Sequence, residues 1–192
     1  MSHFTQIASE IRDLEALAAA VARCGGEVLE NAGCRYYYGT QQKELVIKLP
    51  GRYDAALERQ ADGSYRLTAD WYGGYVARYL GTNGDNLLQF YAAEKAKLEG
   101  RRRGFSVTER QEGTDIIVTL RDPAGGALKI WCSPGGRTVC QPDGIRGHGC
   151  MKFYDLEKAL GAVERHAKTG DFFVEEDPRV VALRVQGATL CG

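Results

Sequence analysis

A glycine-rich segment, Gly144–Cys150, brings a histidine and a cysteine together at the predicted start of a helix. The first backbone N–H groups of a helix have no partner within the helix, so they can bind an anion or a phosphate. At the same position a thiol pKa is lowered, and a nearby histidine can accept the thiol proton. The segment therefore predicts an anion-binding or thiol site. Its candidate residues are Gly144, Arg146, Gly147, His148, Gly149 and Cys150.

The same segment also fits a purely structural role. Glycines before a helix commonly make the turn, and Cys150 falls at the edge of the helix's apolar stripe, where a free cysteine packs as a small hydrophobe. The segment lacks the Lys-Ser/Thr ending of a nucleotide-binding P-loop, and it is not a Gly-x-Gly-x-x-Gly fingerprint after a strand. Both interpretations stay open at this point.

Two further cysteines, Cys132 and Cys140, precede this segment. Zinc accepts cysteine and histidine ligands, so cross-strand placement could join Cys132 and Cys140 with His148 and Cys150 in one metal site. However, no two of the six cysteines form a Cys-x-x-Cys pair, and the spacings match no familiar zinc module. We therefore favour no metal and predict no cofactor.

Composition narrows the class of protein. The 192 residues include 25 Lys and Arg and 25 Asp and Glu, so the net charge does not call for nucleic acid or a membrane. Arg101–Arg103 could contact phosphate, but such a triplet commonly forms a solvated turn. No apolar run is long enough to span a bilayer, and no secretory signal is visible, so we expect a cytoplasmic protein with reduced cysteines.

Apolar periodicity predicts three helices. Asp13 caps the first, which ends at Gly25–Gly26. The second runs from Asp85 to about Glu99 with Gly100 as its C-terminal cap, and it places Glu94 on its apolar face without an evident reason. The third follows Cys150, carries an apolar stripe of Phe153, Leu156, Leu160 and Val163, and ends either at Gly161 or near Lys168.

Alternation and turn residues predict the strands. Asn31–Gly33 reads as a hairpin turn between residues 27–30 and 35–38, and Asp62–Gly63 as a second hairpin turn. Tyr36–Tyr38 and Trp71–Tyr75 could stack on a base or a sugar, although strands favour aromatic residues for packing alone. The other predicted strands are residues 3–7, 44–49, 65–71, 105–109, 115–120, 127–132, 137–141 and 180–185.

The order of helices and strands lacks regular alternation, which predicts an α+β fold with antiparallel meander sheets and about three helices. The two halves repeat the order of meander and helix, so we expect two similar subdomains. The predicted division is an N-terminal α+β domain of residues 1–122 and a C-terminal strand-strand-helix domain of residues 123–192. The turn at Pro123 could equally join neighbouring strands of one sheet.

The opening Met1–Ile7, with Ile11-x-Asp13-x-x-x-Leu17, resembles a family of unknown function found in bacteria, cyanobacteria and some algal plastid genomes. This is the conserved hypothetical chloroplast reading frame thirty-five family (domain of unknown function twelve fifty-seven). The resemblance extends over residues 1 to about 122 and includes Asn86–Tyr91 and Gly104–Phe105.

The remainder, about residues 127 to 176, resembles a second uncharacterised family, domain of unknown function twenty-nine ninety-seven. The resemblance is carried by Gly135–Gly136, Gly144-x-x-Gly147-x-x-Cys150, Leu156–Gly161 and Asp171–Phe173. Proteins of the two families are often encoded beside each other and near AAA-type ATPases, so the resemblance implies an accessory or adaptor role with such an ATPase as protein partner. No Ser–His–Asp order, paired carboxylates or metal motif stands out, which agrees with a non-enzymatic role.

Overall fold

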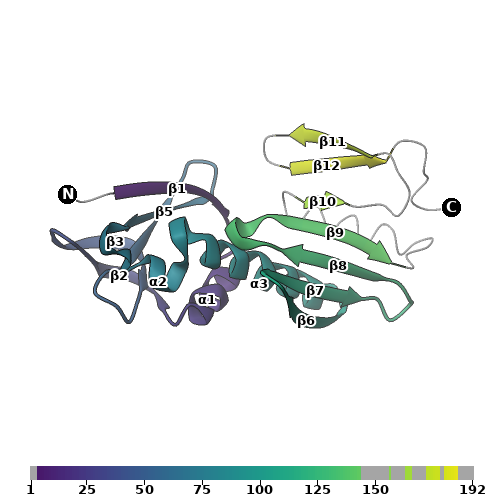
Figure 1. The fold of residues 1–192 in the computed structure, drawn as a ribbon, viewed down its shortest axis with the longest axis horizontal. Coiled ribbons are helices and arrows are strands. Elements are labelled where there is room, and N and C mark those ends of the chain that lie inside the picture. The colour runs from purple at the N-terminus through teal and green to yellow at the C-terminus, as the bar shows by residue number, and fades with distance from the viewer. Residues whose placement is uncertain (1–3, 144–155, 157–162, 166–171, 178–179, 186–192) are drawn as a thin grey trace. The chain divides into compact units, whose positions relative to one another are not determined.

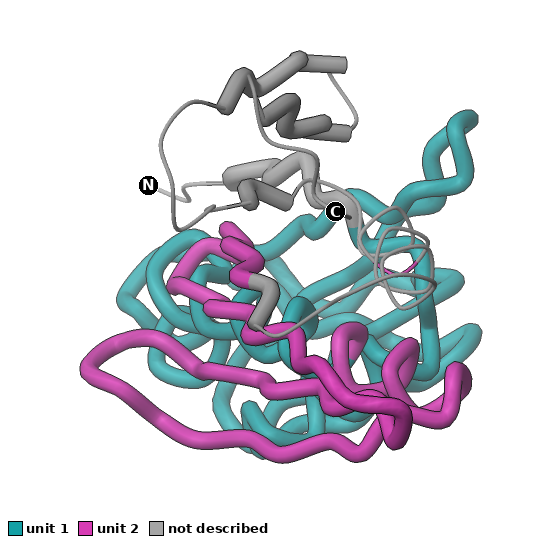
Figure 2. Tube along the Cα trace, turned by 90° about the vertical axis from the view of Figure 1, so that its right-hand side faces the viewer, with its two compact units in different colours: residues 1–94 teal, residues 95–192 magenta. Residues whose placement is uncertain are grey.

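The computed structural model confirms the α+β fold class, with antiparallel meanders in two units (Figure 1). It describes residues 4–143, 156, 163–165, 172–177 and 180–185. The chain forms two compact units, Met1–Glu94 and Lys95–Gly192, which Figure 2 distinguishes by colour. Each unit is built around its own five-stranded sheet. No helix among the described residues is both long and apolar enough to cross a lipid bilayer.

The first unit contains an antiparallel sheet in the order β1-β5-β4-β3-β2. Helix α1 packs against β2, and its apolar side chains join the sheet residues in one core. The strands are β1 Phe4–Ile11, β2 Glu27–Tyr36, β3 Gly39–Lys48, β4 Ala55–Arg59 and β5 Tyr65–Asp70, and the helices are α1 Leu14–Arg23, α2 Ala77–Leu80 and the first part of α3 Asp85–Arg102. Among its fully buried side chains are Ile11, Leu17, Ile47, Leu67, Leu80 and Leu87.

The second unit contains a sheet in the order β10-β9-β8-β7-β6, in which β6 to β9 form the predicted antiparallel meander and β10 runs parallel to β9. A separate antiparallel pair, β11 and β12, follows in the chain. The strands are β6 Ser106–Glu112, β7 Asp115–Arg121, β8 Ala127–Cys132, β9 Thr138–Asp143, β10 Val163–Arg165, β11 Phe172–Asp177 and β12 Val180–Val185.

The predicted division near Pro123 falls inside the second unit. Pro123 lies in the turn between β7 and β8, which is closed by a hydrogen bond from the Asp122 N–H to the Gly126 carbonyl at 3.1 Å. Strands on both sides of that turn therefore share one sheet, which was the alternative that the sequence left open. The compact units instead divide at Glu94, within α3.

The predicted hairpin turn at Asn31–Gly33 is wrong. Strand β2 continues without interruption to Tyr36, and the turn that joins it to β3 consists of Tyr37 and Tyr38. Asn31 takes a left-handed conformation with φ of 48° inside the strand, a conformation that asparagine tolerates better than most residues. The residues Asn-Ala-Gly therefore have the composition of a turn but lie within a strand.

The predicted C-terminal cap of the second long helix is also corrected. Helix α3 continues through Gly100 and ends in a Schellman motif, in which Phe105 N–H donates to the Gly100 carbonyl and Gly104 N–H donates to the Arg101 carbonyl, both at 3.0 Å. Gly104, with φ of 78°, is the capping glycine. Position 100 favours glycine for a different reason, which is close packing. A Cβ atom there would lie 2.6 Å from Leu120 Cδ2.

The third predicted helix lies almost entirely outside the described residues. Leu156 is helical and buried, but Val163–Arg165 forms β10 and pairs with Thr138–Cys140 of β9. A helix that extends to Lys168 is therefore excluded, because Val163, counted in its apolar stripe, belongs to a strand. The predicted strand at residues 180–185 is confirmed as β12.

Candidate functional site

The predicted anion or thiol site does not fall within the part of the chain that the structure describes. Gly144, Arg146, Gly147, His148, Gly149 and Cys150 follow Asp143, the last residue of β9, and all lie outside the described residues. The candidate functional site below therefore consists only of residues that the structure describes.

Cys132 and Cys140 lie on adjacent strands β8 and β9, and both side chains are fully buried. Cys132 stands opposite Thr138, and Cys140 stands opposite Ile130, so the two cysteines share one face of the sheet at diagonal positions. His148 and Cys150, their proposed metal-binding partners, lie outside the described residues. Within the described residues, no group of three or more His, Cys, Asp or Glu side chains is placed to hold a metal ion.

The two described cysteines of the first unit are poor nucleophiles. Burial raises the pKa of the Cys24 thiol to about 11, and Arg23 only partly opposes that increase. Burial likewise raises the pKa of Cys34 to about 11, against a hydrogen bond with Tyr36 that lowers it. Because the thiolate is the reactive form, neither cysteine is suited to thiol chemistry near neutral pH.

The arginine triplet is partly neutralised within its own helix. Arg102 and Arg103 both form ion pairs with Glu99, at three and four residues' separation, and the Arg102–Glu99 distance is 3.1 Å. These pairs reduce the positive charge that the triplet could offer to phosphate groups. Glu94, whose position on the apolar face was unexplained, pairs with Arg23 at 2.9 Å, and the Arg23 guanidinium also covers the ring of Phe90.

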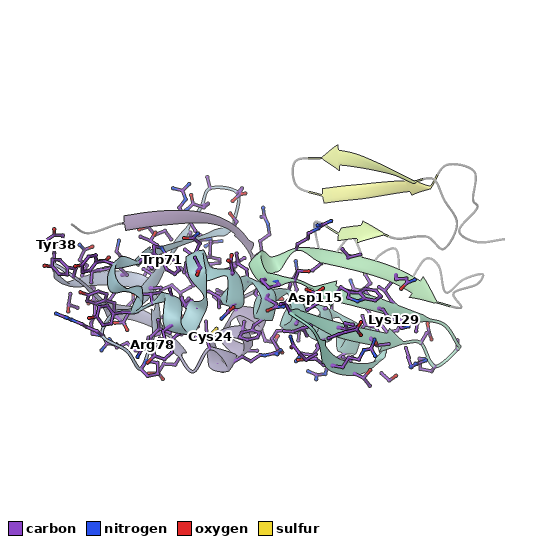
Figure 3. The ribbon with its side chains drawn as sticks, viewed as in Figure 1. Cys24, Tyr38, Trp71, Arg78, Asp115 and Lys129 are labelled. Carbon is purple, nitrogen blue, oxygen red and sulfur yellow. The ribbon has the colours of Figure 1, made fainter. Side chains whose placement is uncertain are left out.

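Four exposed tyrosines from two distant segments form the most distinctive feature of the described surface. They are here called the tyrosine surface: Tyr37, Tyr38, Tyr72 and Tyr75. Among the described residues, Leu14 is the other large apolar side chain with comparable exposure. Tyr38, at the turn between β2 and β3, is the most exposed at 76%, and Figure 3 shows it at the outer end of that hairpin. Exposed aromatic side chains gathered on one unit in this way mark a binding surface.

Ring contacts link three members of the tyrosine surface, and the fourth, Tyr75, contacts a buried tyrosine. The ring of Tyr37 lies edge-on to the rings of Tyr38 and Tyr72, with centroid distances of 4.8 and 5.7 Å. Tyr75 lies edge-on to the buried Tyr53 at 5.1 Å. Such edge-to-face contacts restrict the rings, so less conformational entropy is lost when a ligand covers them.

A buried carboxylate, Asp70, holds the two tyrosine segments in position. Asp70 ends β5 and is fully buried. One of its oxygens, Oδ1, accepts a hydrogen bond from the Tyr72 N–H at 3.0 Å, and the other, Oδ2, accepts one from the Tyr37 N–H at 3.2 Å. One side chain therefore fixes both the β2–β3 turn and the short 3-10 turn Tyr72–Gly74. This arrangement preorganises the tyrosine surface.

A second buried carboxylate, Asp54, anchors the neighbouring loop that carries Arg52. Asp54 accepts hydrogen bonds from the Arg35 side chain at 2.6 and 2.8 Å, from Lys48 Nζ at 3.0 Å and from the Leu49 N–H at 3.1 Å. Burial alone raises the pKa of Asp54, but these hydrogen bonds outweigh it and lower the pKa to about 2. The carboxylate is therefore charged at neutral pH and ties both ends of the loop from Leu49 to Asp54 together.

Arg52 extends the tyrosine surface with a positive charge. Its guanidinium lies 5.5 Å from the ring centroid of Tyr53 and 5.7 Å from that of Tyr75, within the range of cation–π interactions. The side chain is exposed, and it forms no ion pair with any described residue. Phenol rings offer apolar faces and polar edges, and a guanidinium binds carboxylate or phosphate. The group is therefore suited to binding.

Sequence reasoning identified part of this surface and missed what supports it. Tyr36–Tyr38 and Trp71–Tyr75 stood out as aromatic clusters, whereas Arg52 and Asp54 did not. Asp70 lies in the predicted strand of residues 65–71 and was not singled out, yet it is fully buried. A signal for its role was present, since an aspartate two residues before Tyr72 can accept that residue's N–H in an Asx-turn.

The fold and this surface describe an α+β protein whose first unit exposes four tyrosines beside two buried carboxylates. The family model described as Protein of unknown function (DUF1257) matches residues 22–120, and the chain belongs to this family. The match includes the tyrosine surface, Arg52 and both buried carboxylates, and it begins after the opening motif that carried the resemblance in sequence. A comparison with curated proteins finds no match.

Proposed function

We propose that the protein is an accessory module that binds a partner protein through the tyrosine surface. The observation that carries this proposal is the exposure of four tyrosines, two of which, Tyr37 and Tyr72, have backbone N–H groups bound by one buried carboxylate. Tyrosine and arginine are enriched among the residues that contribute most to protein–protein binding, because they bury much area at low entropic cost. The tyrosine surface and Arg52 combine these two residue types.

The charges around the tyrosine surface favour an acidic segment of the partner. Arg52 is exposed, lies over the ring of Tyr75 and forms no ion pair with described residues, whereas the carboxylates that hold this surface, Asp54 and Asp70, are fully buried and engaged by hydrogen bonds. The charge that Arg52 adds to the tyrosine surface is therefore positive, although the whole chain is neutral. One exposed arginine is little for nucleic acid, whose affinity grows with the number of phosphates neutralised.

The identity of the partner rests on the resemblance in sequence. Relatives of the first part are encoded near AAA-type ATPases, and the C-terminal part resembles the family of unknown function twenty-nine ninety-seven, whose members are neighbours of the same genes. We therefore propose an AAA-type ATPase as the partner, a fused arrangement of the two families in this chain, and a cytoplasmic location.

Removing two of the exposed rings should weaken this binding. We expect the double variant Tyr38→Ala and Tyr72→Ala to weaken binding to the purified AAA-type ATPase by about 30-fold or more, which corresponds to about 2 kcal/mol for loss of central aromatic anchors. Isothermal titration of the full chain with the ATPase measures the change. Leu14→Ala is the matched control, because Leu14 is also exposed but lies on α1, outside the tyrosine surface.

Three outcomes would count against the proposal. Equal affinity of the double variant and the wild-type protein would remove the tyrosine surface from the interface. Failure to recover any ATPase from native lysate, followed by no binding to the purified ATPase, would remove the partner. Binding of single-stranded nucleic acid that weakens steeply with salt and depends on Arg52 would replace the protein partner with nucleic acid.

The thiol, metal or anion site at Gly144–Cys150 remains a second proposal. The observation that favours it is the placement of Cys132 and Cys140 on one face of β8 and β9, just before the segment that carries His148 and Cys150. This proposal predicts either stoichiometric metal in protein purified without chelator, measured by elemental analysis, or a Cys150 thiol with a pKa well below that of a free thiol, measured by thiol titration. Cys150→Ser should abolish binding of the metal or anion while leaving cooperative unfolding in place. Metal-free protein whose Cys150 is protected from thiol reagents would show that this cysteine only packs in the core.

A further inference from the structure

A half-open cavity on the sheet of the second unit is a separate candidate binding site. It has a volume of about 380 Å³ and is lined by Asp115, Trp131, Ser133, Val139 and Gln141. This volume lies within the range of about 300 to 1,000 Å³ that is typical of small-molecule sites. The lining comes from β7, β8, β9 and the residue after β8, so one sheet positions all of it.

The register of the sheet explains why these side chains meet. Trp131 stands between Ile117 on β7 and Val139 on β9, and these three residues share one face. Asp115 lies two residues before Ile117, and Gln141 two residues after Val139, so both lie on the same face. Cys132, Ile130 and Cys140 occupy the opposite face, where they are fully buried. Strand alternation therefore separates a buried apolar face from the face that carries the cavity.

The polar groups of this cavity are not used by the described part of the protein. Asp115 forms no ion pair with any described residue, and the indole of Trp131 has no hydrogen-bond partner there. A half-buried indole offers a ring face to a cation, and a carboxylate beside it supplies the opposite charge. Ser133 and Gln141 add neutral hydrogen-bonding groups.

The charged residues around the cavity decide whether Asp115 is available to a cation. Glu112, directly opposite Asp115 on β6, is neutralised by Arg110 at 2.7 Å. Lys129 lies on the same face as Trp131 and stands opposite Gln141 and Thr119, so its positive charge belongs to the Gln141 end of the cavity. Asp115 lies towards the other end, and Figure 3 shows the two residues apart. Lys129 forms no ion pair with Asp115. The carboxylate beside Trp131 therefore remains without a counter-ion among the described residues.

We propose that this cavity binds an organic cation, a quaternary or primary ammonium group, through the ring of Trp131 and the carboxylate of Asp115. The cation lies against the indole face while Asp115 balances its charge, and Ser133 and Gln141 accept or donate hydrogen bonds to the rest of the ligand. This site is independent of the tyrosine surface, since every residue involved belongs to the second unit.

Fluorescence titration of the full chain tests the proposal directly, because Trp71 and Trp131 are its two tryptophans. We expect choline or n-butylammonium to cause a saturable change in tryptophan emission that persists in Trp71→Phe, which assigns the change to Trp131. The neutral isostere of choline, 3,3-dimethylbutan-1-ol, should bind at least about tenfold more weakly. Asp115→Asn, which preserves size and removes charge, should weaken choline binding by about tenfold or more.

The matched control is Glu44→Gln, which removes an exposed carboxylate in the other unit that forms no ion pair with any described residue, and it should leave the titration unchanged. Absence of a saturable response to both ammonium probes would overturn the proposal. An equal response to the neutral isostere, or an unchanged affinity in Asp115→Asn with a native unfolding transition, would overturn it as well, because the cavity would then not select positive charge.

Discussion

Replacing Asp54 with alanine should lower the free energy of unfolding by about 3 to 5 kcal/mol, the usual cost of breaking a buried ion pair by removing one partner. The Asp54 side chain is fully buried, while Arg35 and Lys48 remain about one third exposed. Its removal leaves the Leu49 N–H and the Arg35 N–H without their carboxylate acceptor. Denaturant unfolding followed by circular dichroism measures the loss.

The exposed ion pair between Arg12 and Asp62 provides the control for Asp54→Ala. Its side chains are 43% and 40% exposed, and its N···O distance of 3.1 Å is similar to that of the Lys48–Asp54 pair. Exposed pairs contribute little, so Asp62→Ala should shift the unfolding midpoint much less than Asp54→Ala. Equal shifts in the two variants would show that burial of Asp54 does not set its contribution.

The lowered pKa of Asp54 also fixes the direction of the pH dependence. Its pKa is about 2 in the folded protein against 3.8 for the ordinary carboxyl group. Because the folded value is depressed, the charged carboxylate stabilises the fold fully above the unfolded value, and this stabilisation is lost as the pH falls from about 5 towards 2. The loss amounts to about 2 kcal/mol. Unfolding measured across this range should show a shallower acid decline in Asp54→Asn, whereas an equal decline would exclude Asp54 as its source.

Replacing Asp70 with alanine should remove the hydrogen bonds that hold both segments of the tyrosine surface, the one with Tyr37 and the one with Tyr72. Asp70 is fully buried and accepts hydrogen bonds from the backbone of Tyr37 and Tyr72. Two unsatisfied N–H groups together cost about 2 to 4 kcal/mol. We also expect faster amide hydrogen exchange at Tyr37 and Tyr72 and a loss of partner binding, although Asp70 itself does not reach the surface. Exchange measured by NMR resolves the two amides.

Asp122→Ala separates this local effect from general destabilisation. Asp122 is also buried and also accepts a hydrogen bond from a turn N–H, that of Ala124 at 2.9 Å, but it lies in the second unit. The variant should destabilise the protein while leaving exchange at Tyr37 and Tyr72 close to that of the wild-type protein. If Asp70→Ala left both amides protected, the proposed preorganisation of the tyrosine surface would be wrong.

Local patterns in the sequence were sufficient to predict most of the elements. Alternation located β5 to β9 and β12 within a few residues, and Asp13 was correctly identified as the cap of α1, since its Oδ1 accepts from the N–H groups of Glu15 and Ala16. These features depend on neighbours within a few positions in the chain. The α+β class followed from their order, because fold class depends on the sequence of element types.

Predictions failed where two local signals competed or where a distant contact decided the outcome. Asn31 and Gly33 had turn-forming residue types, but pairing with β3 kept them in a strand. Gly100 was predicted to cap the helix, yet a glycine is needed there because Leu120 on β7 leaves no room for a side chain. Val163 was counted in the apolar stripe of the third helix, but it belongs to β10. Helical periodicity could not predict this, because it does not report the pairing of β10 with β9.

The sequence by itself determined the fold class, most of the elements and the presence of two aromatic clusters. Only the tertiary structure showed that Tyr37 and Tyr72 share one anchor, that Asp54 is buried with a lowered pKa, and that Asp115 and Trp131 meet at one cavity. The physical reason is the range of the interactions. Helix and strand formation depend on near neighbours, whereas burial of charge and the meeting of side chains from separate strands depend on sheet register.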